Sequence, residues 1–192
     1  MTRLLIMGPP GAGKGTQAAR LASTLGVPAI STGDVFREQV RVQSALGLEV
    51  AAILAAGDYV PDETTNAVIA ARLSEPDVST GFILDGYPRT APQVEELDQM
   101  LARASGTLDA VIHLDADADE LVGRLLKRGE DVARSDDNVE AIRHRLDVYA
   151  QQTAPLLEIY RARGLLVSIN GLGGVDAVNR EVVAALSLLQ TP

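Results

Sequence analysis

The chain has 192 residues, of which 46% are hydrophobic, and it carries a formal net charge of −9 at pH 7. This charge argues against a nucleic-acid binder, because contact with a phosphate backbone needs a broad basic face, whereas a nucleotide site needs only a few focused cations. The absence of Cys excludes disulfides and thiolate zinc sites, and no apolar run approaches the ~20 residues of a membrane span. With no visible signal peptide, we expect a cytoplasmic protein that contacts neither nucleic acid nor membrane.

Short apolar runs alternate with stretches of helical periodicity along the chain. Because parallel strands joined by helices give this alternation, we expect an α/β fold with a parallel sheet covered by helices on both faces. Ligands of such folds bind beyond the carboxyl ends of the strands, so the residues that follow each run are the site candidates. The predicted strands are Leu4–Met7, Ala29–Ser31, Phe82–Asp85, Ala110–Leu114 and Leu165–Ile169.

The first predicted strand runs into a glycine-rich loop and then into a helix. Gly8, Gly11 and Gly13 permit positive φ and let backbone amides approach an anion. The N-terminus of the following helix adds its unpaired N–H groups and its dipole. Lys14 can place an ammonium group against the outer phosphates of a nucleotide. Strand, loop, lysine and helix together favour a phosphate site over a glycine turn without a ligand.

One feature of the loop departs from the usual pattern, in which Ser or Thr follows the lysine directly. Here Gly15 follows Lys14, and the hydroxyl of Thr16 comes one residue later. The sequence therefore leaves open which hydroxyl faces a metal ion.

The second predicted strand leads into a helical excursion. We expect Asp34 to cap a first helix that carries Arg37 one turn in. A second helix, Leu48–Ala56, ends at Gly57, which is a C-cap signal. Because a crossover needs only about a dozen residues, the stretch Thr32–Val60 favours a movable flap over an ordinary connection.

The third predicted strand ends in Asp85, which is typical of a carboxylate that faces a metal beside a phosphate loop; a strand-end cap is the alternative. Gly86 allows close approach of a ligand, and Arg89 offers a planar pair of donors suited to phosphate. Gln93, one turn later, can contact a base edge.

The fourth predicted strand contains His113, which we expect to be structural. The helix after it carries Arg124 and Arg128, whose spacing of four places them on one face. The next helix is predicted to start at Asp136 or Asp137.

These motifs occur together over the whole chain. In order, they are Gly8–Gln17, Ser31–Asp34 with Arg37, Gly81–Thr90 with Gln93, Arg124 and Arg128, Arg134–Asp137, Arg145, and Thr153–Leu156. The set resembles the adenylate kinase family of nucleoside monophosphate kinases, which interconvert ATP + AMP and two ADP. Together the motifs are far more specific than a phosphate loop alone.

The resemblance implies a three-layer P-loop kinase fold, with a five-stranded parallel sheet in the order 2-3-1-4-5 and helices on both faces. It divides the chain into a core (1–30, 61–127 and 139–192), an AMP-binding flap (31–60) and a short lid (128–138). The lid lacks the inserted hairpin of many relatives and, without Cys, cannot carry their zinc.

The resemblance also assigns roles to individual residues. The catalytic group would be Lys14, Asp85, Arg89, Arg124, Arg134 and Arg145. ATP would be bound by Gly11, Ala12, Gly13, Lys14, Gly15, Thr16, Arg128 and Gly173. AMP would be bound by Thr32, Arg37, Asp58, Tyr59, Val60, Gly86, Tyr87, Pro88, Arg89, Gln93, Arg134 and Arg145. ATP would be the phosphoryl donor, and Mg²⁺ would be held through ATP and through waters near Asp85 and Thr16.

Two other functions remain open at this point. A UMP/CMP kinase of the same fold is the first, although Thr32, Val60 and Gln93 favour adenine. A nucleotide-binding switch without kinase activity is the second, although Arg37 and Arg89 indicate a second phosphate site that a switch does not need. The family is usually monomeric, and we expect a monomer.

Overall fold

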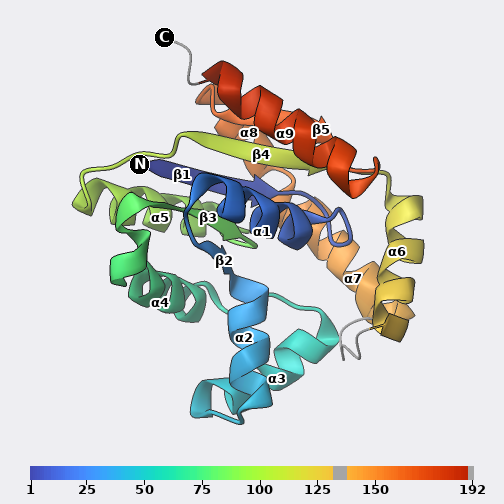
Figure 1. The fold of residues 1–192 in the computed structure, drawn as a ribbon. Coiled ribbons are helices and arrows are strands. Elements are labelled where there is room, and N and C mark those ends of the chain that lie inside the picture. The colour runs from blue at the N-terminus through green and yellow to red at the C-terminus, as the bar shows by residue number, and fades with distance from the viewer. Residues whose placement is uncertain (132–137, 190–192) are drawn as a thin grey trace.

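The computed structural model of the chain describes residues 1–131 and 138–189 (Figure 1). Within them, five strands form one parallel sheet in the order β2-β3-β1-β4-β5, which confirms the predicted fold. The strands are β1 (Thr2–Met7), β2 (Ala29–Ser31), β3 (Gly81–Asp85), β4 (Ala110–Asp115) and β5 (Leu166–Asn170). The α-helices are α1 (Lys14–Leu25), α2 (Thr32–Arg41), α3 (Ala45–Ala56), α4 (Asp62–Leu73), α5 (Ala91–Arg103), α6 (Ala118–Asp131), α7 (Val139–Val148), α8 (Leu156–Ala162) and α9 (Val175–Leu189). A 3₁₀ turn (Pro76–Thr80) precedes β3, and a π-helical segment (Tyr149–Thr153) separates α7 from α8.

The sheet has a hydrophobic core on each face. In β1, Leu4 and Ile6 pack with α1 and α9, whereas Leu5 and Met7 pack with α5 and α8. This sorting follows from the alternation of side chains along a strand. Because both faces are covered, a central strand such as β3 is buried at every residue, which is why these strands read as unbroken apolar runs.

The strand register brings the ends of three strands to one place. Asp85 at the end of β3 pairs with Ile6 of β1 on one side and with Ser31 of β2 on the other. The glycine loop after β1, the start of α2 and the turn after β3 therefore begin at the same edge of the sheet. This edge is the carboxyl end, where parallel sheets bind ligands.

The excursion between β2 and α4 is helical, as predicted, and α2 and α3 extend away from the sheet (Figure 1). They have a small core of their own around Phe36, Val50 and Val60. The two helices approach closely at Gly47, where a Cβ would lie 2.0 Å from the Gln39 carbonyl oxygen. The C-cap of α3 at Gly57 is confirmed by its left-handed backbone (φ 84°).

The N-cap predicted for α2, Asp34, was wrong. Helix α2 is capped by Ser31, whose Oγ accepts a hydrogen bond from the Asp34 N–H (3.3 Å), because Ser31 keeps the extended backbone of β2. Helix α7 begins at Val139 and is capped by Asn138. The predicted starts of α7, Asp136 and Asp137, lie outside the described residues.

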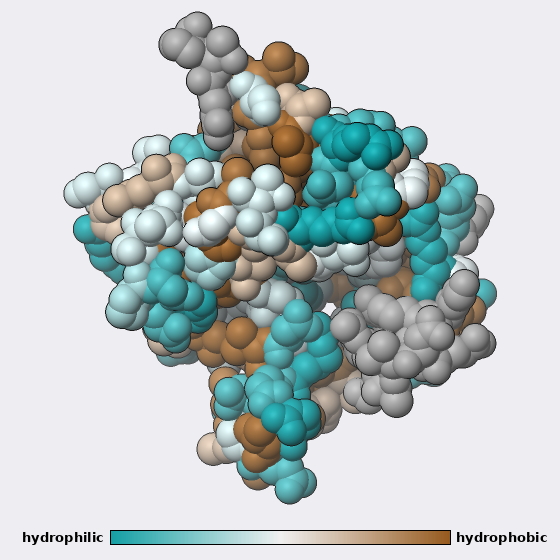
Figure 2. All heavy atoms as spheres, viewed as in Figure 1, coloured by the Kyte–Doolittle hydropathy of each residue, from teal (hydrophilic) through white to brown (hydrophobic). Residues whose placement is uncertain are grey.

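Hydrophilic and hydrophobic side chains are interspersed on the face of the molecule drawn in Figure 2. The large hydrophobic side chains that are exposed in the described part of the chain include Leu48 in α3 and Val175 at the start of α9, which are far apart in the sequence. No described helix is both long enough and apolar enough to span a bilayer.

Candidate active site

The glycine loop joins β1 to α1 through backbone conformations that favour glycine. Gly8, Gly11 and Gly13 have φ values of 143°, 87° and 89°. A Cβ on Gly8 would lie 2.5 Å from the Leu114 carbonyl oxygen, so a larger residue cannot fit there. Gly13 is the N-cap of α1, and no side chain caps that helix. The amides of its first turn can therefore receive an anion.

Lys14 is the first residue of α1, and it folds back over the loop. Its Nζ donates hydrogen bonds to the carbonyl oxygens of Gly8 (2.8 Å) and Pro9 (2.9 Å). The N–H of Ala12 donates to the Pro9 carbonyl (3.2 Å), which closes the turn, and the Ala12 side chain is buried in the core. Among the loop residues Gly8, Pro9, Ala12 and Lys14, Lys14 is the one with a charged side chain.

Asp85 lies under the glycine loop, at the buried end of β3. Burial raises the pKa of its carboxyl above the ordinary value, and the positive charges of Lys14 and Arg89 act in the opposite direction. Its Oδ2 lies 3.5 Å from the position that a Cβ on Gly15 would occupy. Glycine between Lys14 and Thr16 therefore keeps open the space beside the carboxylate.

Arg89, which follows β3, is held at several points. Its Nε donates to the Gly86 carbonyl (2.7 Å), and its backbone N–H donates to Gln93 Oε1 (2.7 Å). Its Cζ lies 4.7 Å from the centroid of the Tyr59 ring, a cation–π contact. The Gly86 carbonyl also accepts a hydrogen bond from Thr32 Oγ1 (2.9 Å).

A narrow pocket adjoins Arg89, between α2, α3 and the turn after β3. Most of the residues expected at the AMP site line it, namely Thr32, Asp58, Tyr59, Val60, Gly86, Arg89 and Gln93. The apolar residues Phe36 and Leu54 also line this pocket. The sequence reading had not singled out these two residues, because their spacing fits a helix core equally well.

Gln93 is almost fully buried (1% exposed) and both ends of its amide are bonded within the protein. Its Oε1 accepts from the Arg89 N–H and its Nε2 donates to Asp62 Oδ1 (2.6 Å). Tyr87 is also buried, and its hydroxyl donates to Asn66 Oδ1 (2.7 Å). In this structure, Gln93 fixes the backbone of Arg89, and the buried side chain of Tyr87 anchors the turn after β3 to α4.

A cleft of about 530 Å³ contains both Lys14 and Arg89. Its lining residues are Pro10, Gly11, Gly13, Lys14, Gly15, Thr16, Ser31, Gly33, Asp34, Arg37, Asp85, Gly86, Arg89, Arg124, Leu125 and Arg145. Lysine and arginine contribute five of these side chains and aspartate two, although the chain as a whole is strongly acidic. Tertiary folding thus concentrates positive charge in one cavity.

The remaining predicted arginines have different positions. Arg37 pairs with Asp34 at 2.5 Å on the wall of the cleft. Arg124 donates to the carbonyl oxygens of Gly171 (3.1 Å) and Leu172 (2.8 Å), which fastens α6 to the loop after β5. Gly173, which the resemblance assigns to ATP binding, is the next residue of that loop. Arg134, and the side chain of Arg128, lie outside the described part of the molecule.

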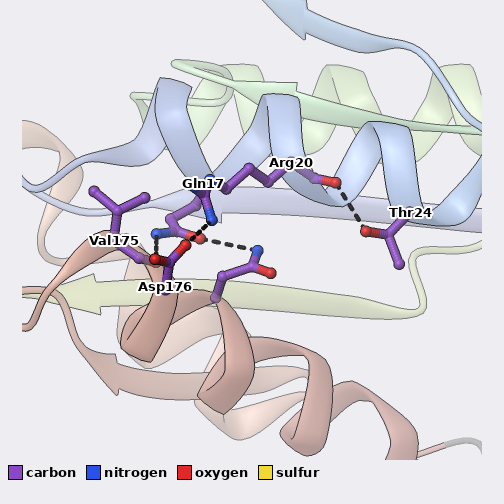
Figure 3. Close-up of polar contacts among 6 residues, drawn as sticks. Gln17, Arg20, Thr24, Val175 and Asp176 are labelled. Atoms are coloured by element: carbon purple, nitrogen blue, oxygen red, sulfur yellow. Dashed lines mark hydrogen bonds and ion pairs between the residues drawn. The ribbon is translucent and has the colours of Figure 1, made fainter.

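The first residues of α9 are also fastened to α1 by polar contacts (Figure 3). The buried side chain of Gln17 donates from Nε2 to the Val175 carbonyl (2.9 Å) and accepts from Asn179 Nδ2 (3.1 Å). Arg20 pairs with Asp176 at 2.5 Å on the surface. Gln17 therefore ties the phosphate-loop helix to the start of α9, which follows Gly173 in the sequence.

Both histidines lie away from the lining of this cleft. His113 is half-buried in β4, and burial lowers its pKa, which agrees with a structural role. His144 on α7 lies 2.6 Å from Asp58 Oδ1, at the end of α3.

A smaller cavity beside the cleft reveals residues to which the sequence reading gave no role. Tyr149 and Thr153 of the π-helical segment line it together with Tyr59, Lys14 and Arg89, and Pro88 lies on the same wall. Thr153 belongs to a recognised motif, so it could have been found from the sequence. Tyr149 carried no such signal.

Known proteins of one family are similar to this chain over most of its length. The family model described as adenylate kinase matches residues 6–165. The chain belongs to the adenylate kinase family. It is 56% identical over 186 residues to an adenylate kinase of Kocuria rhizophila, covering 97% of this chain and 99% of that protein. It is 54% identical over 187 residues to an adenylate kinase of Clavibacter michiganensis, covering 97% and 94%. Adenylate kinase of Leifsonia xyli is likewise 54% identical, over 184 residues that cover 96% and 92%.

Proposed function

We propose that this chain is an ATP:AMP phosphotransferase, which catalyses ATP + AMP = 2 ADP. The observation that carries the proposal is that Lys14 and Arg89 line the same cleft of about 530 Å³. A phosphate loop alone is compatible with many kinds of nucleotide-binding protein. Further arginine side chains in the same cleft fit a second phosphate-bearing substrate.

The cleft would bind the two nucleotides end to end. The amides at the start of α1 and the ammonium of Lys14 would hold the ATP phosphates. Arg37 and Arg89 would hold the AMP phosphate, and the narrow pocket with Thr32 and Val60 would receive its base. This placement brings the attacking oxygen into line with the γ-phosphoryl group.

The reaction needs no covalent intermediate, because the AMP phosphate is itself an anionic nucleophile. The protein's contribution is position and positive charge around the migrating group. Lys14, Arg89, Arg124 and Arg145 supply that charge from the described residues, and Arg134 would add to it from the lid.

The donor atoms at the cleft fit a magnesium ion. Mg²⁺ prefers oxygen ligands and keeps several of its waters, and the Asp85 carboxylate and the Thr16 hydroxyl line the same cavity. Bound with ATP, Mg²⁺ neutralises charge on the phosphate oxygens. Asp85 and Thr16 would hold it through water. Within the described residues, no cluster of three or more His, Cys, Asp or Glu forms a separate metal site.

We further propose that residues 31–60 move as a flap on the core (1–30, 61–127 and 139–192); residues 132–137 of the expected lid (128–138) lie outside the described residues. The separate hydrophobic cluster of α2 and α3 supports a flap that moves as a unit. Closure would exclude water from the reacting phosphates. The absence of Cys favours a protein without zinc. The usual state of the family favours a monomer, and we propose that it acts in the cytoplasm.

The test is formation of ADP when the purified chain is mixed with ATP, AMP and Mg²⁺. We expect ADP with AMP and much less product with UMP or CMP. Preference for a pyrimidine monophosphate would instead identify a UMP/CMP kinase. ATP binding with no turnover of any monophosphate would identify a non-catalytic switch.

A further inference from the structure

The motif Thr153–Leu156 has no role in the mechanism above, although its first residue lies in the wall next to Lys14 and Arg89. Thr153 ends the π-helical segment between α7 and α8. It is 5% exposed, which makes it one of the few buried polar residues among those described. Single π-helical turns in proteins often occur at functional sites, because they redirect a side chain that a regular helix would point elsewhere.

The Thr153 hydroxyl joins two residues from distant parts of the chain. Its Oγ1 donates to the Arg89 carbonyl oxygen at 2.9 Å, and it lies 2.9 Å from the Tyr59 hydroxyl. A threonine hydroxyl has one proton, and here that proton goes to Arg89. The Tyr59 hydroxyl is therefore the donor in the second bond, so one threonine acts as donor to Arg89 and as acceptor from Tyr59.

Tyr59 contacts Arg89 a second time, through its ring, which lies 4.7 Å from the guanidinium carbon. The backbone of Arg89 is thus fixed from Thr153, and its side chain is supported by a ring that Thr153 also holds. Tyr59 belongs to the proposed flap (31–60), whereas Arg89 and Thr153 belong to the core. Loss of the two hydrogen bonds of the Thr153 hydroxyl would therefore weaken the positioning of Arg89 and the attachment of the flap to the core.

We propose that Thr153 is a positioning residue for AMP: it orients Arg89 toward the acceptor phosphate and docks Tyr59 of the flap against the core. This inference rests on the proposed phosphotransferase function and deepens it. It predicts a selective effect, because Thr153 bonds Arg89 and Tyr59, the two residues assigned to AMP. If Thr153 only filled space in the core, its replacement would change the stability of the protein but would not change the KM for AMP more than the KM for ATP.

The first experiment compares Thr153→Val with Thr153→Ser in the full chain. Valine has nearly the shape of threonine but leaves the Arg89 carbonyl and the Tyr59 hydroxyl without their partner, so we expect the KM for AMP to rise roughly tenfold. The KM for ATP should stay within about twofold, since the loop around Lys14 is untouched. Thr153→Ser, which keeps the hydroxyl, should restore the KM for AMP.

The second experiment tests the coupling to Tyr59. Tyr59→Phe keeps the ring under Arg89 and removes only the hydroxyl, so it should raise the KM for AMP less than Thr153→Val does. The double variant should resemble Thr153→Val alone, because both changes remove the same bond. Thr24→Val is the matched control: Thr24 bonds only the Arg20 carbonyl of its own helix at the surface, and its KM values should equal those of the wild type.

The outcomes separate the two proposals. A wild-type chain that forms no ADP would overturn the proposed function, and the role of Thr153 with it. An active wild type would leave the function standing. The role of Thr153 alone would then be overturned by equal changes in both KM values, by a lower melting temperature with unchanged KM, or by a serine variant that behaves like valine.

Discussion

Replacing Gly86 with alanine would test how closely the turn after β3 is built around Arg89. Gly86 has φ +81°, and a Cβ there would lie 2.7 Å from Thr32 Oγ1 and 2.8 Å from Arg89 Nη2. The guanidinium end of Arg89 can swing away, but Thr32 is buried and bonded to the Gly86 carbonyl. Alanine should therefore break that bond and displace the arginine.

The magnitude follows from two contributions. A left-handed backbone costs an L-residue about 1–2 kcal/mol, and the lost hydrogen bond costs about 1 kcal/mol. The sum of about 2–3 kcal/mol corresponds to a fall in Tm of roughly 4–12 °C for a chain of this size, at about 2–4 °C per kcal/mol.

Gly164→Ala provides the matched control. Gly164 has a similar φ of +70°, but a Cβ there would meet no atom within 4 Å. This variant should lose only the backbone contribution of about 1–2 kcal/mol and should keep the wild-type KM for AMP. Thermal unfolding and initial-rate assays of both variants make the comparison. The reasoning fails if Gly86→Ala has an unchanged KM for AMP and the same Tm as Gly164→Ala.

Three further changes test the charges in the cleft. Lys14→Met should lower kcat at least about 100-fold in the ADP assay while circular dichroism stays native; turnover near the wild-type rate would exclude its role in catalysis. Arg89→Ala should raise the KM for AMP by about 10–100-fold with little change for ATP, and equal changes for both nucleotides would contradict its assignment to the acceptor side. Asp85→Asn should abolish most activity and yet raise Tm at pH 7 by about 1–8 °C, because burial raises the folded-state pKa of this carboxyl, so that its ionisation opposes folding. A carboxyl with a raised folded pKa contributes stability at low pH that is lost as the pH rises through that pKa, so the Tm difference should shrink on acidification. A Tm difference that grows as the pH falls would refute this account.

Local sequence determined the strands, the phosphate loop and the main helices. The alternation of apolar runs located every strand to within two residues, because strands buried on both faces need continuous hydrophobic sequence. Helix starts were less certain: Ser31 and Asp34 are both good caps, and only the extended backbone that leaves β2 selects Ser31.

Long-range contacts decided how the site is held together. The sequence marked Arg89 and Gln93 as candidates, but not that Gln93 would be fully bonded to Arg89 and Asp62. Nor could it indicate that Thr153 bonds Arg89 across 64 positions of the chain. Residue types and their spacing are enough to specify a phosphate loop, since its chemistry is local. The contacts that hold Arg89 form only where the packing of the sheet, the flap and the π-helical segment brings separate parts of the chain together, and that information is tertiary.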